Sequence, residues 1–225
     1  MDLHSDSPYW LMKDGMLHTY PSLQANKKTD IVIMGAGITG AIIGYHLNKA
    51  GLEVMLVDKR HAATGSTCAS TALLQYEIDI PLIRLVEKAG EKDAVRSYRL
   101  CLDALTSIKN ISEHIGHKSL EAKPSLQYAS FKKDAGPHYQ EYLLRKKYNF
   151  PVDWLSEKEI KRYYHLSAPG AILSAVAAQT DPYELADDLL QYLVKHGSEV
   201  YDATEIKKIV RQERKIELTT GEGYV

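Results

Sequence analysis

The chain has 225 residues, with 28 Lys and Arg against 29 Asp and Glu, so it carries no overall positive field that would attract nucleic acid. No apolar run reaches the ~20 residues that a membrane-spanning helix needs. The two cysteines are too few for a disulfide framework and are typical of a reducing compartment. The N-terminus has neither the positive start nor the apolar core of a secretory signal. The sequence therefore predicts a cytoplasmic protein without a nucleic-acid partner or a transmembrane segment.

The first predicted elements form a strand–helix–strand unit. Residues 31–34 are apolar and rich in β-branched side chains, as expected of a strand that is buried on both faces. Gly44 and Leu47 follow at the spacing of a short amphipathic helix, which ends at a glycine cap, Gly51. Residues 54–57 are again apolar and form the second strand.

Three glycines in the pattern G-x-G-x-x-G separate the first strand from the helix. Gly35 allows the tight turn out of the strand, Gly37 lets a pyrophosphate approach the backbone, and Gly40 lets the helix pack closely on the sheet. The helix N-terminus offers amide donors and the positive end of a dipole, so it binds an anion without a basic side chain. The sequence therefore predicts a dinucleotide phosphate site formed by Gly35, Ala36, Gly37, Ile38, Thr39 and Gly40.

An acidic residue, Asp58, ends the second strand at about 20 residues past the glycines. A carboxylate in this place accepts hydrogen bonds from both ribose hydroxyls, which favours FAD or NAD over NADP. Lys59 follows Asp58 and is included in the candidate site, although Lys59 and Arg60 weaken the argument against NADP. The alternative interpretation is a glycine-rich turn in some other α/β protein.

The next segment, residues 61–74, is small and rich in hydroxyl groups. Backbone amides and hydroxyls of such a loop can wrap a second phosphate or the ribityl chain of a flavin. Thr64, Gly65, Ser66 and Thr67 are therefore added to the candidate site. Cys68 lies among these small residues, where a cysteine more often serves packing than reactivity.

The remaining pattern alternates between helices and strands. A capping box opens one helix at Ser156, and Asp181-Pro182 provides an N-cap and a first-turn proline for another, which runs to Gly197. A strand at 215–220 is followed by a turn and by the start of a further strand at Tyr224-Val225. The other predicted elements are helices at 94–115 and 139–148 and strands at 125–131, 171–176 and 199–203.

Two other groups of residues suggest sites of their own. His114-x-x-His117 has a spacing that could hold a metal, but a surface cap at a helix end is the favoured interpretation, because no third ligand has a convincing spacing. No metal site is therefore predicted. Tyr76 is a candidate for the lining of a polar substrate cleft.

Several segments resemble the D-amino-acid oxidase superfamily of flavoproteins, which includes glycine oxidase, monomeric sarcosine oxidase and the γ-glutamylputrescine oxidases. The small loop after Asp58 is similar to the family's loop behind the ribose-binding acid. The opening at 7–10 and 20–23 resembles the N-terminal arm of the putrescine-type branch. Residues 180–185 resemble the family's V-D-P-x-x-L helix start, and residues 204–206 its T-x-V strand, whose backbone meets the adenine. The resemblance thus adds Ile206 to the candidate cofactor residues.

The resemblance implies an α/β fold with a Rossmann-like FAD-binding domain of the GR2 type and an inserted, incomplete α+β substrate domain. We expect an N-terminal arm at residues 1–29, a discontinuous FAD-binding domain at 30–78 and 167–225, and the first part of the substrate domain at 79–166. Relatives of this kind continue further, so we expect an N-terminal piece of a longer protein that lacks turnover by itself.

The function that the resemblance implies is FAD-dependent oxidation of the C–N bond of an amine or amino acid, by hydride transfer to flavin N5. No catalytic residue is predicted, because the family's substrate-contacting residues lie mostly beyond residue 225. Two alternatives stay open at this point: an NAD-dependent dehydrogenase and a non-catalytic dinucleotide-binding fragment. The sequence does not determine the oligomeric state.

Overall fold

A computed structural model describes residues 8–221 and divides into two compact units. The first unit comprises the chain up to Ala72, Ser112–Ser119 and the part from Asp181 onward. The second unit comprises Leu73–Ile111 and Leu120–Thr180. The predicted strand start at Tyr224-Val225 lies outside the described residues.

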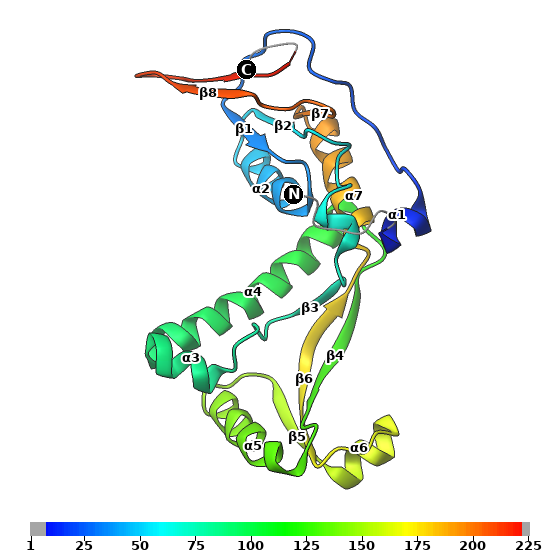
Figure 1. The fold of residues 1–225 in the computed structure, drawn as a ribbon, viewed down its shortest axis with the longest axis vertical. Helices are drawn as coiled ribbons and strands as arrows, with labels where there is room; N and C mark the ends of the chain where they lie inside the picture. The colour runs from blue at the N-terminus through cyan, green and yellow to red at the C-terminus, as the bar shows by residue number, and fades with distance from the viewer. Residues whose placement is uncertain (1–7, 222–225) are drawn as a thin grey trace. The chain divides into compact units, whose positions relative to one another are not determined.

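A parallel sheet forms the centre of the first unit (Figure 1). Its strand order is β1 (Ile31–Met34), β2 (Val54–Val57) and β7 (Glu199–Tyr201). Helix α2 (Ile38–Lys49) connects β1 to β2 and packs against α7 (Pro182–Lys195). Every residue of the central strand β2 is buried, which explains its unbroken apolar sequence. The predicted strand–helix–strand unit is confirmed, but the expected burial of its first strand on both faces is wrong, because β1 is half-buried and Met34 is exposed.

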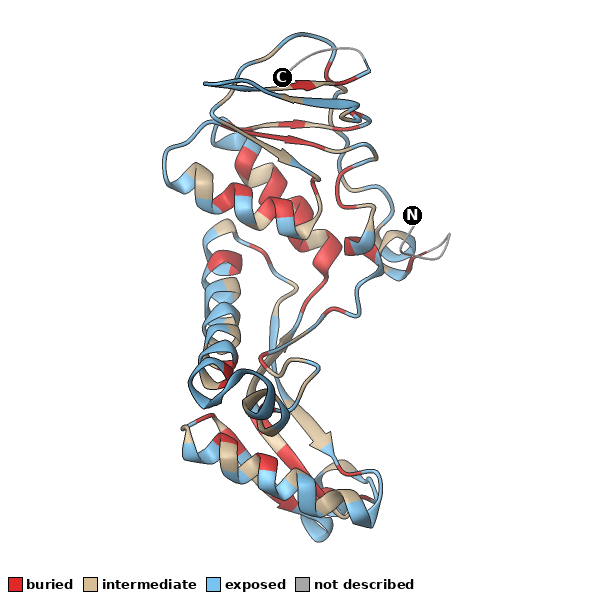
Figure 2. Ribbon diagram, turned by 60° about the vertical axis from the view of Figure 1, so that its left-hand side comes forward, coloured by how far each residue is buried: buried red, intermediate tan, exposed pale blue. Residues whose placement is uncertain are grey.

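Helix α7 begins as its sequence predicts. The Asp181 carboxylate accepts hydrogen bonds from the amides of Tyr183 (2.9 Å) and Glu184 (3.0 Å), and Pro182 occupies the first turn. The helix then buries an apolar stripe that includes Leu189, Leu190 and Leu193, and Figure 2 marks such buried residues in red.

The described part of the N-terminal arm, residues 8–29, belongs to the first unit. It contains the short helix α1 (Tyr9–Asp14). The apolar side chains Trp10, Leu11 and Leu17 pack on a small buried cluster that includes Cys68 of the 3-10 helix η1 (Ser66–Ala69). Packing therefore accounts for the cysteine, as predicted.

A two-stranded antiparallel pair, β8 (Lys208–Arg211) and β9 (Ile216–Thr219), ends the described part of the first unit. The predicted strand at Thr204–Ile206 is wrong, because these residues form an irregular connection between β7 and β8. The Thr204 amide donates to the carbonyl of Asp58, the residue that follows β2, at 2.7 Å and is not part of a regular strand pairing.

The second unit is built on an antiparallel sheet. Strand β6 (Gly170–Gln179) pairs with β3 (Leu73–Gln75), β4 (Glu121–Tyr128) and β5 (Val152–Ser156). The structural division therefore falls at 72 and 180 instead of at the expected 78 and 166, because β3 and β6 belong to this sheet. The unit's helical residues come from α3 (Leu82–Ala89), α4 (Glu91–Ile115, as far as Ile111), α5 (Lys132–Lys147) and α6 (Glu157–Tyr164).

Aromatic side chains form the core of the second unit. The Tyr76 and Phe150 rings stack with centroids 5.6 Å apart, and Tyr98 meets Phe150 edge-on at 5.8 Å. Tyr76 is fully buried, so the interpretation of this residue as the lining of a substrate cleft is wrong. The hydroxyl of Tyr76 lies 3.1 Å from that of Ser174, which satisfies its polar end within the core. None of the described helices is long and apolar enough to cross a membrane.

Candidate functional site

The predicted phosphate turn joins β1 to α2 in a conformation that only small residues allow. Gly35 has a φ of +108°, in the region that favours glycine, and its amide donates to the Val57 carbonyl at 2.8 Å. A Cβ on Gly40 would lie 2.0 Å from the Gly35 carbonyl oxygen and 3.3 Å from Ile33 Cγ2. The third glycine therefore permits the close approach of helix and strand, as its place in the pattern predicts.

The second glycine faces the small hydroxyl-rich loop. A Cβ on Gly37 would lie 2.9 Å from Thr67 Oγ1. This hydroxyl accepts a hydrogen bond from the Ile38 amide at 3.0 Å, at the first turn of α2. Thr67, 29 residues after Ile38 in the sequence, is thus brought to the N-terminus of α2.

Asp58 turns its carboxylate toward the same turn. Its Oδ2 accepts the Ala36 amide at 2.8 Å, and its Oδ1 accepts the Arg60 amide at 2.9 Å. An ionised carboxylate has about four acceptor sites, so the two backbone bonds orient the group and leave acceptor capacity for ribose hydroxyls. The structure therefore brings Asp58 and the glycine turn together, as the sequence predicts.

The loop that follows Asp58, which we call the cofactor loop (residues 58–70), is tied to the glycine turn. The Ala63 amide donates to the Ala36 carbonyl at 3.0 Å. Thr64 closes a local turn through its hydroxyl, which donates to the His61 carbonyl at 2.7 Å. Gly65 accepts the Cys68 thiol at 3.1 Å, and Ser66 begins η1. Burial raises the pKa of the Cys68 thiol, which disfavours a reactive thiolate.

A depression of about 400 Å³ opens in the first unit next to the cofactor loop. Lys59 lines this depression together with Thr204, Glu205 and Lys207 of the connection between β7 and β8. Ile206 lies within this connection with a half-buried side chain. The remaining lining residues are Ser22, Leu23, Ala203, Thr220 and Gly221.

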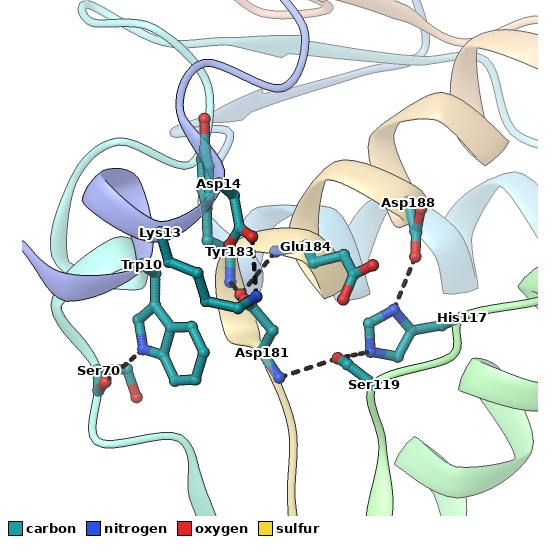
Figure 3. A network of polar contacts seen from close by, with 10 residues as sticks. All are labelled: Trp10, Lys13, Asp14, Ser70, His117, Ser119, Asp181, Tyr183, Glu184 and Asp188. Carbon is teal, nitrogen blue, oxygen red and sulfur yellow. Dashed lines mark hydrogen bonds and ion pairs between the residues drawn. The ribbon is translucent and has the colours of Figure 1, made fainter.

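Two buried aspartates of the first unit were not predicted as candidate-site residues from the sequence. Asp202, directly after β7, accepts the Ala62 amide of the cofactor loop at 2.7 Å. Asp181, predicted only as a helix cap, also binds the Lys13 ammonium of the arm at 2.9 Å (Figure 3). For Asp202 a signal was present in the sequence: an aspartate that follows a parallel strand lies at the same sheet edge as Asp58.

A chain of polar contacts continues from Asp181 (Figure 3). The Asp181 amide donates to Ser119 Oγ at 3.0 Å, Ser119 Oγ lies 2.9 Å from His117 Nε2, and His117 Nδ1 lies 2.7 Å from Asp188. His117 is buried, so its predicted place as a surface cap is wrong. No cluster of metal-binding side chains occurs among residues 8–221.

The charge on Asp181 is stabilised within this chain of contacts. Burial acts to raise the pKa of the carboxyl, but the Lys13 ammonium and the Glu184 amide act in the opposite direction. The net pKa lies below its ordinary value, so the group stays ionised near neutral pH. Asp181 therefore serves at once as the cap of α7 and as the ion-pair partner of the arm.

These features fit an FAD dinucleotide. A side chain at Gly37 or Gly40 would clash with neighbouring atoms, and one at Gly35 would strain the backbone, so the turn needs all three glycines. The amides at the start of α2 are donors of the kind that hold a pyrophosphate. The Asp58 carboxylate stands at the carboxyl edge of the sheet, where open parallel sheets bind their ligands. All of these groups belong to the first unit.

Comparison with known proteins also indicates an FAD-binding protein. Residues 30–225 match the family model described as FAD dependent oxidoreductase (DAO). The chain therefore belongs to this family, whose cofactor is FAD.

Among individual proteins, the chain is 25% identical over 207 residues to a Bacillus subtilis protein named as a Rieske 2Fe-2S iron-sulfur protein, YhfW. The match covers 92% of this chain and 40% of that protein. Glycine oxidase of Geobacillus kaustophilus is 26% identical over 186 residues, with 79% of this chain and 46% of the relative covered. The chain thus spans less than half the length of these two relatives.

A solved structure shares the fold. L-proline dehydrogenase from P. horikoshii superposes with a TM-score of 0.73 at 20% identity, over 89% of this chain and 51% of the other. The Rossmann-like α/β class predicted from the sequence is confirmed by this match and by the parallel sheet of the first unit.

Proposed function

We propose that this chain supplies the FAD-binding part of an oxidoreductase that oxidises the C–N bond of an amine or amino acid. The observation that carries the proposal is the glycine turn with the Asp58 carboxylate hydrogen-bonded to its Ala36 amide. FAD, when bound, supplies a hydride acceptor at flavin N5 for the C–H bond next to the substrate nitrogen. The protein's own contribution is to bind and orient the cofactor.

Each part of the site has a separate role in this proposal. The backbone from Gly35 to Gly40 holds the pyrophosphate at the positive end of α2. Asp58 accepts the ribose hydroxyls, and Thr64 to Thr67 place amides and hydroxyls beside the phosphates. The depression that is lined by Lys59 and by Glu205 and Lys207, the neighbours of Ile206, receives the adenine. The first unit is then the FAD-binding domain, and the second unit is the first part of the substrate domain.

The substrate class is supported by the names of the relatives. Glycine oxidase and L-proline dehydrogenase are both named as oxidoreductases of an amino acid. Because this chain spans only part of their length, the activity is proposed for the whole polypeptide to which the fold belongs.

The activity is tested with full-length protein, loaded with FAD and mixed with a panel of amines and amino acids in the absence of oxygen. We expect bleaching of the flavin absorption by at least one amine or amino acid. A protein that binds NAD but not FAD would contradict the proposal, and so would a flavin that no member of the panel reduces. The same assay on the 225-residue chain tests the expectation that it lacks turnover by itself.

Replacement of Asp58 by alanine should weaken FAD binding by about 1.5–3 kcal/mol, the usual contribution of a charge-assisted hydrogen bond. The measurement is a titration of the apoprotein with FAD, followed by flavin fluorescence. Asp30→Ala is the matched control, since Asp30 also accepts a backbone amide, that of Glu53 at 3.0 Å, but stands at the opposite end of the sheet. Equal affinities of Asp58→Ala and wild type would remove Asp58 from the site.

A further inference from the structure

Asp202 joins two segments that are distant in the sequence. Its side chain is buried, and the residue lies at the carboxyl end of β7, the strand beside the one that ends at Asp58. Oδ1 accepts the amide of Ala62 in the cofactor loop at 2.7 Å, and Oδ2 accepts the amide of Tyr20 in the arm at 3.0 Å. The His61 ring nitrogen Nδ1 lies 3.2 Å from Oδ2. One carboxylate thus holds the arm and the loop together.

The backbone around Asp202 extends this connection to the glycine turn. Ala63, next to the amide that Asp202 binds, donates to the carbonyl of Ala36 in the turn. Ala63 and Ala203 both have a left-handed backbone, with φ values of +60° and +44°. Such conformations are costly for alanine and persist only where the surrounding contacts impose them. The contacts of Asp202 lie next to both residues.

The arm fastens the other end of the loop as well. Trp10 Nε1 donates to the carbonyl of Ser70 at 2.9 Å (Figure 3). The side chains of Trp10, Leu11 and Leu17 cover the apolar cluster that contains Ala63 and Cys68. The cofactor loop is therefore held near both ends, at Ala62 through Asp202 and at Ser70 through Trp10.

We propose that Asp202 is a positioning residue of the FAD site, which sets the affinity for FAD by holding the cofactor loop and the N-terminal arm in place. The inference rests on the FAD site proposed above. Asp202 acts through the Ala62 amide and through the Ala63–Ala36 hydrogen bond on the turn that faces the pyrophosphate. Without the carboxylate, the buried amide of Ala62 and the partly buried amide of Tyr20 lose their acceptor, and the loop moves away from the turn.

The test uses Asp202→Asn, which keeps the shape of the side chain. An amide has one acceptor oxygen, so its NH₂ group faces one of the two backbone donors and cannot satisfy it. We expect the Kd for FAD to rise about tenfold, because an unsatisfied buried donor weakens the arrangement that binds the cofactor. Titration with FAD, followed by flavin fluorescence, measures the change.

Asp187→Asn is the matched control. Asp187 is also a buried aspartate of the first unit and also contacts the arm, with Oδ2 2.7 Å from His18 Nδ1. Asp187 belongs to α7, and this contact connects α7 to the arm and does not involve the cofactor loop. We expect both variants to lower the melting temperature but only Asp202→Asn to lower the FAD affinity. Equal losses of affinity in both variants would overturn the proposal.

Hydrogen exchange of the apoprotein provides a readout that does not depend on FAD. Asp202→Asn should accelerate exchange at the amides of Ala62 and Tyr20, whereas Asp187→Asn should leave Ala62 protected. If wild-type protein fails to bind FAD, the proposed function fails, and exchange alone then decides whether Asp202 holds the loop. Unchanged protection of Ala62 in Asp202→Asn would overturn the inference even in a protein that binds FAD.

A milder variant covers the case in which Asp202→Asn does not fold. The His61 side chain is 52% exposed, so His61→Ala should fold while it removes one of the partners of the Asp202 carboxylate described above. We expect its Kd for FAD to rise about threefold, in keeping with the modest contribution of a single hydrogen bond. If His61→Ala binds FAD as wild type does and Asp202→Asn is unfolded, Asp202 is a structural residue only and the proposal is wrong.

Discussion

Replacement of Gly40 by alanine is expected to abolish FAD binding and to lower the free energy of unfolding of the first unit by about 3 kcal/mol or more. The added Cβ would lie 2.0 Å from the carbonyl oxygen of Gly35. That oxygen belongs to the backbone of the turn, so no side-chain rotation relieves the clash. Helix α2 must move away from β1, and the amides at its N-terminus move with it. FAD titration and urea unfolding measure the two effects.

Gly44→Ala is the control, one turn further along the same helix. The tightest contact of a Cβ there is with the end of the Leu193 side chain, at 3.0 Å from Cδ1, while Ile33 Cδ1 and Leu56 Cδ1 lie at an ordinary contact distance of 3.6 Å. A small shift of that side chain makes room, and alanine is the better helix former by about 1 kcal/mol. We expect FAD binding to be retained and the free energy of unfolding to change by no more than about 1 kcal/mol. Similar losses for both variants would mean that the contact between Gly40 and Gly35 does not decide the packing.

Replacement of Arg145 by methionine should lower the free energy of unfolding of the second unit by about 3–5 kcal/mol, the cost of leaving buried partners without their counter-charge. The Arg145 side chain is only 1% exposed. Its Nε donates to Glu141 at 2.6 Å, and its Nη atoms contact Glu77 at 3.3 Å and Gln127 at 3.1 Å. The measurement is urea unfolding followed by Trp154 fluorescence in a Trp10→Phe background.

The reason for this large effect is the second task of Glu141. Its carboxylate also accepts the amides of Leu82 (2.8 Å) and Ile83 (2.9 Å) at the start of α3. Loss of Arg145 therefore disturbs the anchoring of α3 as well as the ion pairs. Because Glu141→Gln removes a buried charge and keeps an acceptor for one of these two amides, the double variant Arg145→Met/Glu141→Gln should recover part of the lost stability.

Lys146→Met is the neighbouring control for Arg145→Met. Lys146 pairs with Asp153 at 3.0 Å, but the two side chains are 48% and 70% exposed. An exposed ion pair contributes little, so we expect a loss below about 1 kcal/mol. If Arg145→Met were no more destabilising than Lys146→Met, the buried network would not stabilise the second unit.

The sequence by itself determined the local geometry of the candidate FAD site. The glycine pattern, the apolar strand before it and the acid after the second strand occur within about 30 residues, the span of one βαβ unit. The helix cap at Asp181 was also predictable from the sequence, because its carboxylate accepts hydrogen bonds from amides two and three residues away. Interactions of this short range follow from residue type and spacing alone. The family resemblance then named FAD as the cofactor, and the family match bears this out.

Only the tertiary structure decided which buried polar groups meet. Asp202 and Tyr20 are 182 residues apart, and His117 and Asp188 are 71 apart. A polar side chain in the sequence looks the same whether it is solvated or buried against a distant partner, and burial is what makes that partner necessary. The pairing of β6 with β3, β4 and β5, which places β6 in the second unit, was also decided by the tertiary structure. The residue pattern of a strand specifies which face is buried but not which strand lies beside it. The short-range contacts of the candidate site therefore follow from the sequence, whereas the distant partners of Asp202 are identified only when the folded chain brings their segments together.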